Sequence, residues 1–591
     1  MQQLAISLGQ YTTAGAKAEN QDFHGALQPE GADLAVKGIA VAISDGISAS
    51  RLGAAAAETA VKTFLTDYYC TSAAWSVQTS AERVIAATNS WMYAQNSGGR
   101  TLSDEERETG LVCTFSAMVL KSRTAHLFHI GDARIARITD SGVEELTVPH
   151  RVSLGGGENY LGRALGINRH VEVDYRQCTV QPGDMFMLST DGVHEYLAGS
   201  ETNRIIADAS SLDDAAREIA DAARANGSND NLTVQLVRIE SLPSGEIGDL
   251  VGREATLPPA PLLKAGDTFE GYTILRQLHA SSRSHVYLAR DDADGSKVAL
   301  KILSTELVGE ESARASMQLE EWAMRRIAHQ NVLKAAPQRA SRRHLFSVSE
   351  YVEGPSLMEW IHDHPQPDLT QVRDIVRQVA SGLLALHRRE MLHRDLRPHN
   401  VLIDADGTAR IIDFGSVQVA GLDEIAPREV EDAAFAGTLQ YSAPELYHSE
   451  RATTRSDLYS LGVIAYQMLT GALPYGSKIP ATASASALRK LSYIPAESLN
   501  PAVPPWMDGA IAKAVSLDPE RRYVELSEFT YDLANPNPEF AGRASVPLLE
   551  RNAARVWQVI AAVLAVALAI SIATRPDAAP HTSPQPKEIR Q

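Results

Sequence analysis

Two ordered sets of short acidic motifs divide this chain into two parts. The first set, between residues 22 and 230, consists of Asp-Gly and Asp-Asn pairs. The second set, between residues 301 and 445, contains Val-Ala-Leu-Lys, His-Arg-Asp, Asp-Phe-Gly and Ala-Pro-Glu in that order. The residues between the two sets, 241–267, are rich in Pro and Gly and lack hydrophobic periodicity, which indicates a linker. Since 591 residues exceed what one hydrophobic core serves, the sequence predicts two to four domains.

The expected organisation has six segments along the chain. The predicted segments are a first domain at 1–240, a linker at 241–267, a second domain at 268–536, a juxtamembrane segment at 537–555, an apolar helix at 556–574 and a short tail at 575–591.

Composition excludes several classes of protein. The formal net charge of −18 argues against a role that depends on neutralising nucleic-acid phosphates. The three cysteines, Cys70, Cys113 and Cys178, lie far apart and form no Cys-x-x-Cys pair, so we expect isolated thiols in a reducing cytosol. The first nine residues carry no basic n-region and no long apolar run, and we expect no signal peptide.

Residues 556–574 read VWQVIAAVLAVALAISIAT, nineteen residues without a charge. A helix of this length spans about 28 Å at 1.5 Å per residue, close to the hydrocarbon thickness of a bilayer. A buried helix is the alternative, but no following domain is available to cover its circumference. We therefore expect a single membrane span, with both preceding domains in the cytoplasm and a polar, disordered tail beyond it.

In the first part, apolar runs that read as buried strands end in carboxylates. Ile39–Ser44 precedes Asp45-Gly46, and Met185–Thr190 precedes Asp191-Gly192, while 54–65 and 81–94 between them have helical periodicity. A single Asp-Gly is most often a turn. An ordered set of carboxylates, however, offers the hard oxygen ligands that Mg²⁺ and Mn²⁺ prefer. The candidate ligands are Asp22, Asp45, the carbonyl of Gly46, Asp191 and Asp230.

This set, with Gly110–Thr114 and the turn Gly131-Asp132-Ala133-Arg134, resembles the metal-dependent (type 2C) Ser/Thr protein phosphatases over residues 7–239. The resemblance implies a four-layer α/β/β/α sandwich and two Mn²⁺ or Mg²⁺ ions that activate water for attack on phosphorus. It implies that Asp45 bridges both ions and that the Gly46 carbonyl joins one of them. The first ion's shell would be completed by Asp191 and Asp230, and a third, weaker site would use Asp132.

Two positions depart from that pattern. Gln21 stands where many relatives have Glu, so Asp22 is expected to carry more of the second ion's shell. Lys17 stands where an Arg often grips the substrate phosphate; it keeps the charge but loses the bidentate fork.

The second part resembles the eukaryotic-like (Hanks-type) protein kinases over about 272–535, with a two-lobed α+β fold. The motifs that carry the resemblance are Val-Ala-Leu-Lys at 298–301, His-Arg-Asp at 393–395, Asp-Phe-Gly at 413–415 and Ala-Pro-Glu at 443–445. Their order and spacing make this signal specific, whereas a lone His-Arg-Asp would be weak.

The resemblance assigns roles in phosphoryl transfer from ATP. Lys301 would hold the α/β-phosphates and pair with Glu320 on a helix. Glu321 is the less favoured partner, because its side chain points about 100° away from that of Glu320 around the helix. Asp395 would accept the substrate hydroxyl proton. The remaining expected contacts are Asn400 and Asp413 to Mg²⁺, Arg397 (in place of the usual Lys) to the γ-phosphate, Leu278 and Val286 around the nucleotide, and the backbone near Glu350 and Val352 to adenine.

The loop that should be rich in Gly reads LHASSRSHV over 278–286, with His279, Ser281 and Ser284 at the three glycine positions. Glycine there lets backbone N–H groups approach the phosphates closely, so its loss is expected to loosen ATP binding.

The predicted activation loop has an unusual composition. Residues 417–436 contain no Ser, Thr or Tyr but five acidic residues, Asp423, Glu424, Glu429, Glu431 and Asp432. Kinases of this kind often use the Arg before the catalytic Asp, here Arg394, to hold a phosphorylated loop. Our hypothesis is that one of these carboxylates meets Arg394 instead; a solvated acidic loop is the alternative.

The expected function is therefore bifunctional signalling in a bacterium, at the inner membrane. One domain would phosphorylate Ser/Thr of proteins, the chain itself being a candidate substrate, and the other would dephosphorylate phospho-Ser/Thr. Two alternatives remain open at this stage: an active phosphatase fused to a nucleotide-sensing pseudokinase, and a non-enzymatic membrane scaffold.

Overall fold

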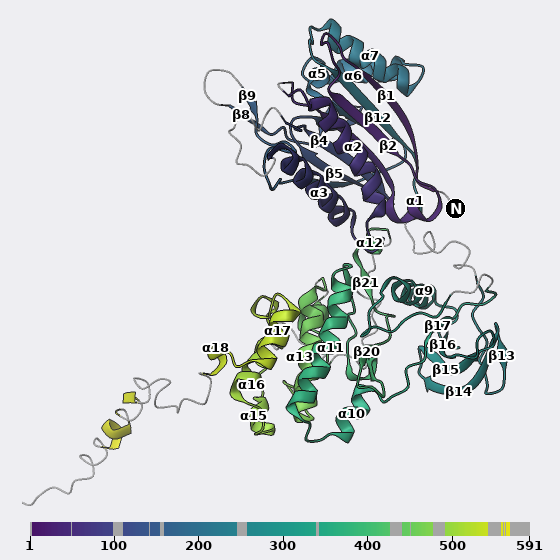
Figure 1. The fold of residues 1–591 in the computed structure, drawn as a ribbon, viewed down its shortest axis with the longest axis vertical. Helices are drawn as coiled ribbons and strands as arrows, with labels where there is room; N and C mark the ends of the chain where they lie inside the picture. The colour runs from purple at the N-terminus through teal and green to yellow at the C-terminus, as the bar shows by residue number, and fades with distance from the viewer. Residues whose placement is uncertain are drawn as a thin grey trace, which may run out of the picture.

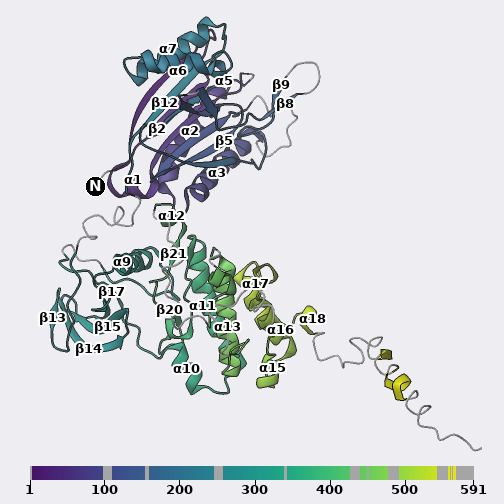
Figure 2. The ribbon, with the colours of Figure 1, turned by 180° about the vertical axis from the view of Figure 1, so that it is seen from behind.

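A computed structural model gives the structure of the chain. It describes residues 3–48, 50–97, 110–140, 142–153, 159–244, 257–337, 342–425, 440–448, 451–476, 491–541, 557–558, 561 and 563–567. The described residues form two domains, and the first lies above the second in Figure 1. Figure 2 shows the same arrangement from behind, with α6 and α7 at the end of the first domain farthest from the second.

Two five-stranded antiparallel sheets make up the centre of the first domain. One sheet contains, in spatial order, β1 (Ala5–Thr13), β12 (Leu232–Ser241), β11 (Met185–Ser189), β6 (Arg134–Thr139) and β7 (Gly142–Glu145). The other contains β10 (Asp174–Thr179), β5 (Thr124–Ile130), β4 (Phe115–Lys121), β3 (Ile39–Asp45) and β2 (Asp22–Leu27). A separate short pair is formed by β8 (Arg151–Ser153) and β9 (Asn159–Leu161).

Helices cover the outer faces of both sheets. The second sheet is covered by α2 (Gly53–Cys70) and α3 (Val77–Ser97), and the first by α7 (Leu212–Ala225), with α1 (Gly31–Lys37), α5 (Asp191–His194) and α6 (Gly199–Asp208) nearby. Alternation along β3 explains the layering, because successive side chains of a strand point to opposite faces. Ala40 and Ala42 pack against the helices, whereas Ile39, Val41 and Ile43 pack between the sheets. The predicted four-layer sandwich is confirmed.

The small lobe of the second domain is a five-stranded antiparallel sheet with one helix. Its strands, in spatial order, are β13 (Thr268–Phe269), β14 (Tyr272–Ala280), β15 (Ser284–Asp291), β16 (Lys297–Leu303) and β17 (Ser347–Glu350), and its helix is α9 (Glu311–Arg326). Part of the predicted linker belongs here. Ala260 and Leu263 lie in the small-lobe core, and the N–H of Leu345 donates to the carbonyl of Pro258.

The large lobe is mainly helical. Its helices are α10 (Leu357–Asp363), α11 (Leu369–His387), α12 (Ala420–Asp423), α13 (Thr454–Thr470), α15 (Ala496–Leu499), α16 (Pro505–Ala514), α17 (Leu526–Ala534) and α18 (Pro538–Ala541). Short strand pairs join β18 (Met391–Leu392) to β21 (Gln418–Val419) and β19 (Val401–Ile403) to β20 (Ala409–Ile411), and 3-10 turns occupy 398–400, 444–448 and 519–521. The predicted two-lobed fold is confirmed.

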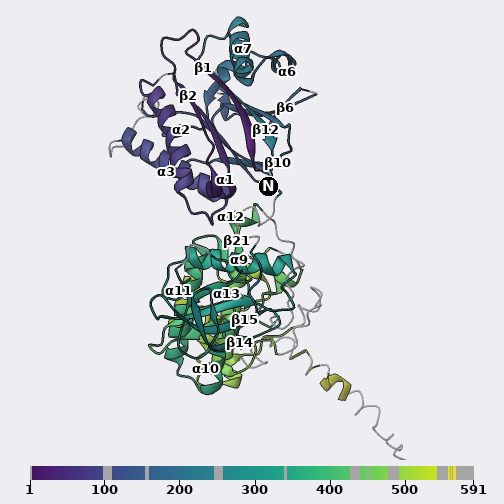
Figure 3. The ribbon, with the colours of Figure 1, turned by 90° about the vertical axis from the view of Figure 1, so that its right-hand side faces the viewer.

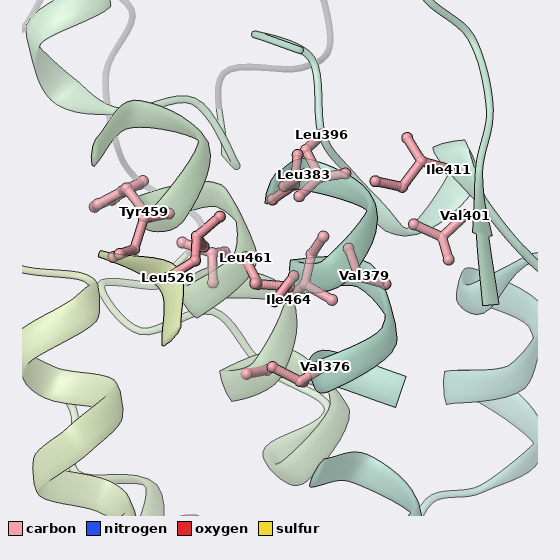
Figure 4. Packing of buried hydrophobic residues seen from close by; sticks show 14 of the residues in the cluster. Val376, Val379, Leu383, Leu396, Val401, Ile411, Tyr459, Leu461, Ile464 and Leu526 are labelled. Atoms are coloured by element: carbon pink, nitrogen blue, oxygen red, sulfur yellow. The ribbon is translucent and has the colours of Figure 1, made fainter. Parts of the chain in front are cut away.

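The apolar face of α11 forms the centre of the large lobe. Figure 4 shows Val376, Val379 and Leu383 of α11 facing Ile464 of α13, with Ile411 of β20 beside them. The side chain of Asp368 accepts from the N–H of Thr370 and so caps the start of this helix. This core fixes β18 and the loop after it, which carries the candidate catalytic residues.

In the part of the chain that the structure describes, no helix is both long enough and apolar enough to cross a membrane. Most of the predicted span at 556–574, and all of the predicted tail at 575–591, lie outside the described residues.

Candidate active sites

The structure brings the five candidate aspartates of the first domain into one region. Asp22 at the start of β2 pairs directly with Asp45 at the end of β3. Burial raises the pKa of Asp45 well above its ordinary value, and the charges of Asp22, Asp191, Asp132 and Asp230 raise it further. The five carboxylates are therefore close enough for their charges to act on one another.

The Asp22 carboxylate is buried and held by hydrogen bonds from neighbouring side chains. Its Oδ2 accepts from the hydroxyls of Thr190 at 2.9 Å and Thr233 at 2.7 Å. Its Oδ1 is buried and, among the described residues, has no hydrogen-bond partner. Burial raises the pKa of Asp22 to about 6, although both threonine hydroxyls lower it. A buried carboxylate oxygen without a donor is the kind of atom that a bound cation satisfies.

Two basic side chains lie among the aspartates. Arg151 donates from Nε to Asp132 at 3.0 Å and from Nη2 to Asp191 at 3.3 Å. Lys17 pairs with Asp230 and donates to Ser48 Oγ. Of the residues that the structure describes, no three acidic, His or Cys side chains are gathered tightly enough to enclose an ion. Arg151 and Lys17 thus balance the carboxylate charge in this arrangement.

Gly46, the expected carbonyl ligand, packs directly against the backbone of Gly53. A Cβ built on Gly46 would lie 2.3 Å from the carbonyl carbon of Gly53, at the start of α2. Glycine at 46 therefore has a packing reason that is independent of any ion.

Gln21 does not face the aspartate cluster as a ligand would. Its side-chain amide donates to the carbonyl of Ser50, which ties β2 to the loop after β3.

In the second domain, the candidate phosphate-binding residues form one ion-pair cluster. Lys301 Nζ on β16 lies 2.8 Å from Glu320 Oε2 on α9 and 2.9 Å from Asp413 Oδ1. Burial opposes the charge of Lys301, but the two carboxylates raise its pKa above its ordinary value. Glu321 points elsewhere, to Arg325 and Arg342. The small lobe and the Asp-Phe-Gly motif are thereby joined across the cleft between the lobes.

Asp395 lies beside Asn400 and Arg397. Asn400 Nδ2 donates to the Asp395 carbonyl at 2.8 Å, and Arg397 Nε lies 3.7 Å from Asp395 Oδ2. Burial raises the pKa of Asp395 above its ordinary value, although Arg397 lowers it. Beneath this loop, Asp457 accepts from the N–H groups of His393 and Arg394, both at 2.9 Å.

The loop between β14 and β15 closes on itself. The hydroxyl of Ser281 accepts from the N–H groups of Arg283 at 3.2 Å and Ser284 at 3.1 Å. The Ser281 N–H donates to the Ser284 carbonyl. Backbone donors that would otherwise be available to phosphate are therefore used inside the hairpin.

The expected nucleotide-contacting positions lie on three strands of the small lobe and just after the last of them. Leu278 lies on β14 and Val286 on β15, Glu350 ends β17, and Val352 is buried just after it. The side chain of Glu350 pairs with Arg410 at 2.9 Å, which leaves only its backbone for the expected adenine contact.

Comparison with protein families matches both parts. The family described as "Protein phosphatase 2C" matches residues 11–237, and the family described as "Protein kinase domain" matches residues 272–529. The chain joins a protein phosphatase 2C domain to a Ser/Thr protein kinase domain.

Bacterial kinases are the sequence relatives of the kinase domain. The Ser/Thr protein kinase PknL of Mycobacterium tuberculosis is 32% identical over 265 residues, which cover 44% of this chain and 64% of PknL. A probable Ser/Thr protein kinase PknB of Lactococcus lactis is 28% identical over 46% of this chain and 43% of its own length. The chain thus spans less than two thirds of these relatives.

Solved structures with similarity to the chain match one domain each. The kinase domain of Mycobacterium tuberculosis PknI is 26% identical, covers 47% of this chain and 100% of its own, and has a TM-score of 0.37. A Ser/Thr phosphatase of S. agalactiae is 20% identical, covers 40% of this chain and 100% of its own, and has a TM-score of 0.35.

A buried ion pair in the kinase domain joins the Ala-Pro-Glu motif to the following helices. Arg522 donates to both carboxylate oxygens of Glu445, at 2.7 and 2.8 Å. Ser456 donates to the same carboxylate.

Sequence reasoning missed three residues of the phosphatase site. Arg151 lies outside every motif, so nothing in the sequence singles it out. Asn231 follows Asp230 directly and could have been found; its side chain accepts from the Gln21 N–H and donates to the carbonyls of Ala14 and Glu19. Thr233, which supports Asp22, lies two residues further along β12.

Proposed function

We propose that the protein is a bifunctional signalling enzyme. Its kinase domain transfers phosphate from ATP to Ser/Thr of protein substrates, and its phosphatase domain removes phosphate from phospho-Ser/Thr. The observation that carries the proposal is the joint presence of the Lys301–Glu320–Asp413 cluster and the aspartate cluster of the phosphatase domain. The family matches support both domain types.

In the phosphatase domain, the aspartate cluster would hold two Mn²⁺ or Mg²⁺ ions. The oxygen-only donor set and the unpartnered Oδ1 of Asp22 fit such ions. The bound ions would lower the pKa of a water and stabilise the leaving oxygen. The proposed ligands are Asp22, Asp45, the Gly46 carbonyl, Asp191 and Asp230, with Asp132 at a weaker site.

The two basic side chains in this cluster have a role of their own in the proposal. Arg151 pairs with Asp132 and Asp191, and Lys17 pairs with Asp230, so both side chains lie beside the proposed ligands. Lys17 would attract the phosphate of the substrate.

In the kinase domain, each residue acts on one part of the transfer. Glu320 orients Lys301, which holds the α/β-phosphates of the nucleotide. Asp395 takes the proton of the substrate hydroxyl, and Arg397 faces the γ-phosphate. The remaining proposed contacts are Asn400 and Asp413 to Mg²⁺, Leu278 and Val286 to the nucleotide, and the backbone near Glu350 and Val352 to adenine.

One observation favours a second candidate function, a nucleotide-sensing pseudokinase. The Ser281 hydroxyl uses backbone N–H groups that would otherwise be free for phosphate. Calorimetry with Mg-ATP on the full chain, beside a label-transfer assay, separates the two candidates. ATP binding with equal label transfer by the wild type and Asp395→Asn would establish the sensor; loss of transfer in Asp395→Asn supports the kinase.

We also propose domain limits of 1–240 and 268–536, and a C-terminal membrane anchor at 556–574 that places both domains at the cytoplasmic face of the bacterial inner membrane. The charge-free run of nineteen residues supports the anchor. Cell fractionation tests it. The full chain is expected in the membrane fraction, and a Val563→Lys, Val566→Lys variant is expected to leave it.

The phosphatase proposal is tested with a generic aryl phosphate and the full chain. Hydrolysis is expected to require Mn²⁺ and to fall by at least about 100-fold in Asp191→Asn, because a lost charged ligand weakens both metal binding and transition-state stabilisation. Ser228→Ala, which changes a buried hydroxyl near Asp230 without removing a ligand, is the matched control. Equal rates in the wild type and Asp191→Asn would contradict the assignment.

A further inference from the structure

The two domains contact each other through a surface that neither activity explains. On the phosphatase side it comprises residues 71–79, which run from the end of α2 into the first residues of α3, and 121–122, at the end of β4. On the kinase side it comprises residues 388–390 and 420–425, which include α12. We call these residues the docking surface. Figure 3 shows α12 and β21 between the domains, and α12 has the same place in Figure 1.

At one point of the docking surface the backbones of the two domains meet at a glycine. The N–H of Gly421 in α12 donates to the carbonyl of Ala74 at 2.9 Å. A Cβ at 421 would lie 2.6 Å from the Trp75 carbonyl oxygen, 2.9 Å from that of Ala73 and 3.0 Å from that of Ala74. No larger residue fits there without moving the phosphatase loop. Ala74 itself is fully buried within the hydrophobic cluster of the kinase large lobe.

The N-terminus of phosphatase helix α3 is capped by the kinase domain. Glu390 accepts from the N–H of Ser76 at 2.7 Å and from the hydroxyl of Thr79 at 2.6 Å. Glu424 accepts from the N–H of Val77, the first residue of α3, at 2.9 Å. The free N–H groups and the positive end of a helix favour carboxylates at this place. Both carboxylates at this helix end, those of Glu390 and Glu424, come from the kinase domain.

A buried ion pair completes the docking surface. The side chain of Lys121 is 1% exposed; its Nζ lies 3.0 Å from Glu424 Oε2 and 2.6 Å from the carbonyl of Gly421. The buried ammonium of Lys121 is held in place by these partners, because removing either member of the Lys121–Glu424 pair leaves the other charge buried without compensation. The hydroxyl of Ser122 donates to the carbonyl of Ile425 beside it.

The docked kinase segment connects directly to the catalytic residues. Residues 420–425 follow Asp413 by a few positions, and the intervening β21 pairs with β18, which leads into Asp395. In this same docked arrangement, Lys301 contacts both Glu320 and Asp413. The segment 417–436 contains no Ser, Thr or Tyr that could be phosphorylated. Burial lowers the pKa of the Arg394 guanidinium, and the charge of Asp423 opposes this shift.

We propose that the phosphatase domain is the partner that holds the kinase activation segment in its catalytically assembled arrangement, in place of phosphorylation. The phosphatase domain thus has a second role, as an intramolecular scaffold, which does not use its metal site. This inference rests on the proposed kinase function.

Gly421→Ala in the full chain is the sharpest test. The three atoms nearest to the added methyl are phosphatase carbonyl oxygens, and Gly421 has no positive φ, so the expected clash is with the phosphatase loop. Gly309→Ala is the matched control, because a Cβ there meets nothing within 4 Å. Lys121→Met, with Lys62→Met at an exposed site of the same domain as its control, removes the ion pair by a separate route.

Three readouts are taken on each full-length variant: amide hydrogen exchange at 71–79 and 420–425, label transfer from ATP to a protein substrate, and Mn²⁺-dependent aryl phosphate hydrolysis. Gly421→Ala and Lys121→Met are expected to speed exchange at both segments and to lower kinase kcat by roughly tenfold or more, as overpacking or an unpaired buried charge would. Hydrolysis by the phosphatase domain is expected to stay within about twofold, and both controls to behave as wild type.

Every other outcome contradicts the proposed scaffold role of the phosphatase domain. Unchanged exchange in Gly421→Ala would show that the domains do not dock in solution. Faster exchange with an unchanged or increased kinase rate would show that docking does not hold the active arrangement. A wild type without any label transfer would overturn the proposed kinase function and the scaffold role with it, while slow exchange at 420–425 would still establish the contact.

Discussion

Asp22 shows how a single residue can be prepared for a ligand by its neighbours. Two threonine hydroxyls, of Thr190 and Thr233, donate to one of its carboxylate oxygens, and the other oxygen is buried without a protein donor among the described residues. Sequence reasoning found Asp22 from its place in Asn-Gln-Asp but could not assign these hydrogen bonds, because the two threonines lie 168 and 211 residues away along the chain.

The pairing of Arg522 with Glu445 is the clearest residue-scale test of the kinase fold. Both side chains are almost fully buried, at 0% and 5% exposed. Arg522→Ala leaves the Glu445 carboxylate buried without its partner and is expected to lower the free energy of unfolding of the kinase domain by about 3–5 kcal/mol. Denaturant unfolding followed through the kinase-domain tryptophans measures this.

The neighbouring Arg521 provides the control for that measurement. Its side chain is 80% exposed and pairs only with Asp518, so Arg521→Ala is expected to change the free energy of unfolding by less than about 1 kcal/mol. Equal losses in the two variants would contradict the structural role given to the Arg522–Glu445 pair.

At the scale of elements, the sequence predicts best where local pattern and burial agree. The helices α2, α3 and α11 and the strands β3 and β11 follow from their local sequence patterns, and the Lys301–Glu320 spacing anticipates the contact between β16 and α9. Arg151 could not be predicted, because its position among the aspartates depends on a short strand pair with no motif.

The packing of two further segments, 257–264 and α12, could not be predicted from the sequence for similar reasons. Residues 257–264 read as linker, since their packing on the small lobe depends on distant residues such as Leu345. Nothing in the local sequence of α12 shows that it contacts the phosphatase domain, because the partner loop lies more than 300 residues away. Contacts of this kind arise from tertiary packing, and propensity carries no information about them.

The hairpin between β14 and β15 supports an element-scale prediction. Replacing His279, Ser281 and Ser284 together by Gly removes the Ser281 hydroxyl from the turn and frees backbone N–H groups for phosphate. The KM for ATP is expected to fall by about three- to tenfold, the effect of one or two recovered hydrogen bonds. Initial rates of label transfer across ATP concentrations measure it.

Ser282→Gly, at a position of the same turn that is not a glycine position in the family, is the control and should leave the KM unchanged. If the triple variant binds ATP no better than the wild type, the closed hairpin is not what limits nucleotide affinity.

At the scale of the whole molecule, one chain joins a protein phosphatase 2C domain to a protein kinase domain, and the two domains contact each other through the docking surface. The two domain families were predictable from motif order alone, and the family matches confirm them. Their contact was not predictable, and under the proposed scaffold role the phosphatase domain would influence kinase activity through it.

The most direct test of the account measures both directions of phosphate transfer on one protein substrate, with the purified full chain and its two active-site variants. Asp395→Asn is expected to abolish label transfer from ATP and to keep Mn²⁺-dependent release from prephosphorylated substrate. Asp191→Asn is expected to do the reverse. Loss of both activities in either variant, or of neither, would contradict the claim that two separate sites on this chain add and remove phosphate.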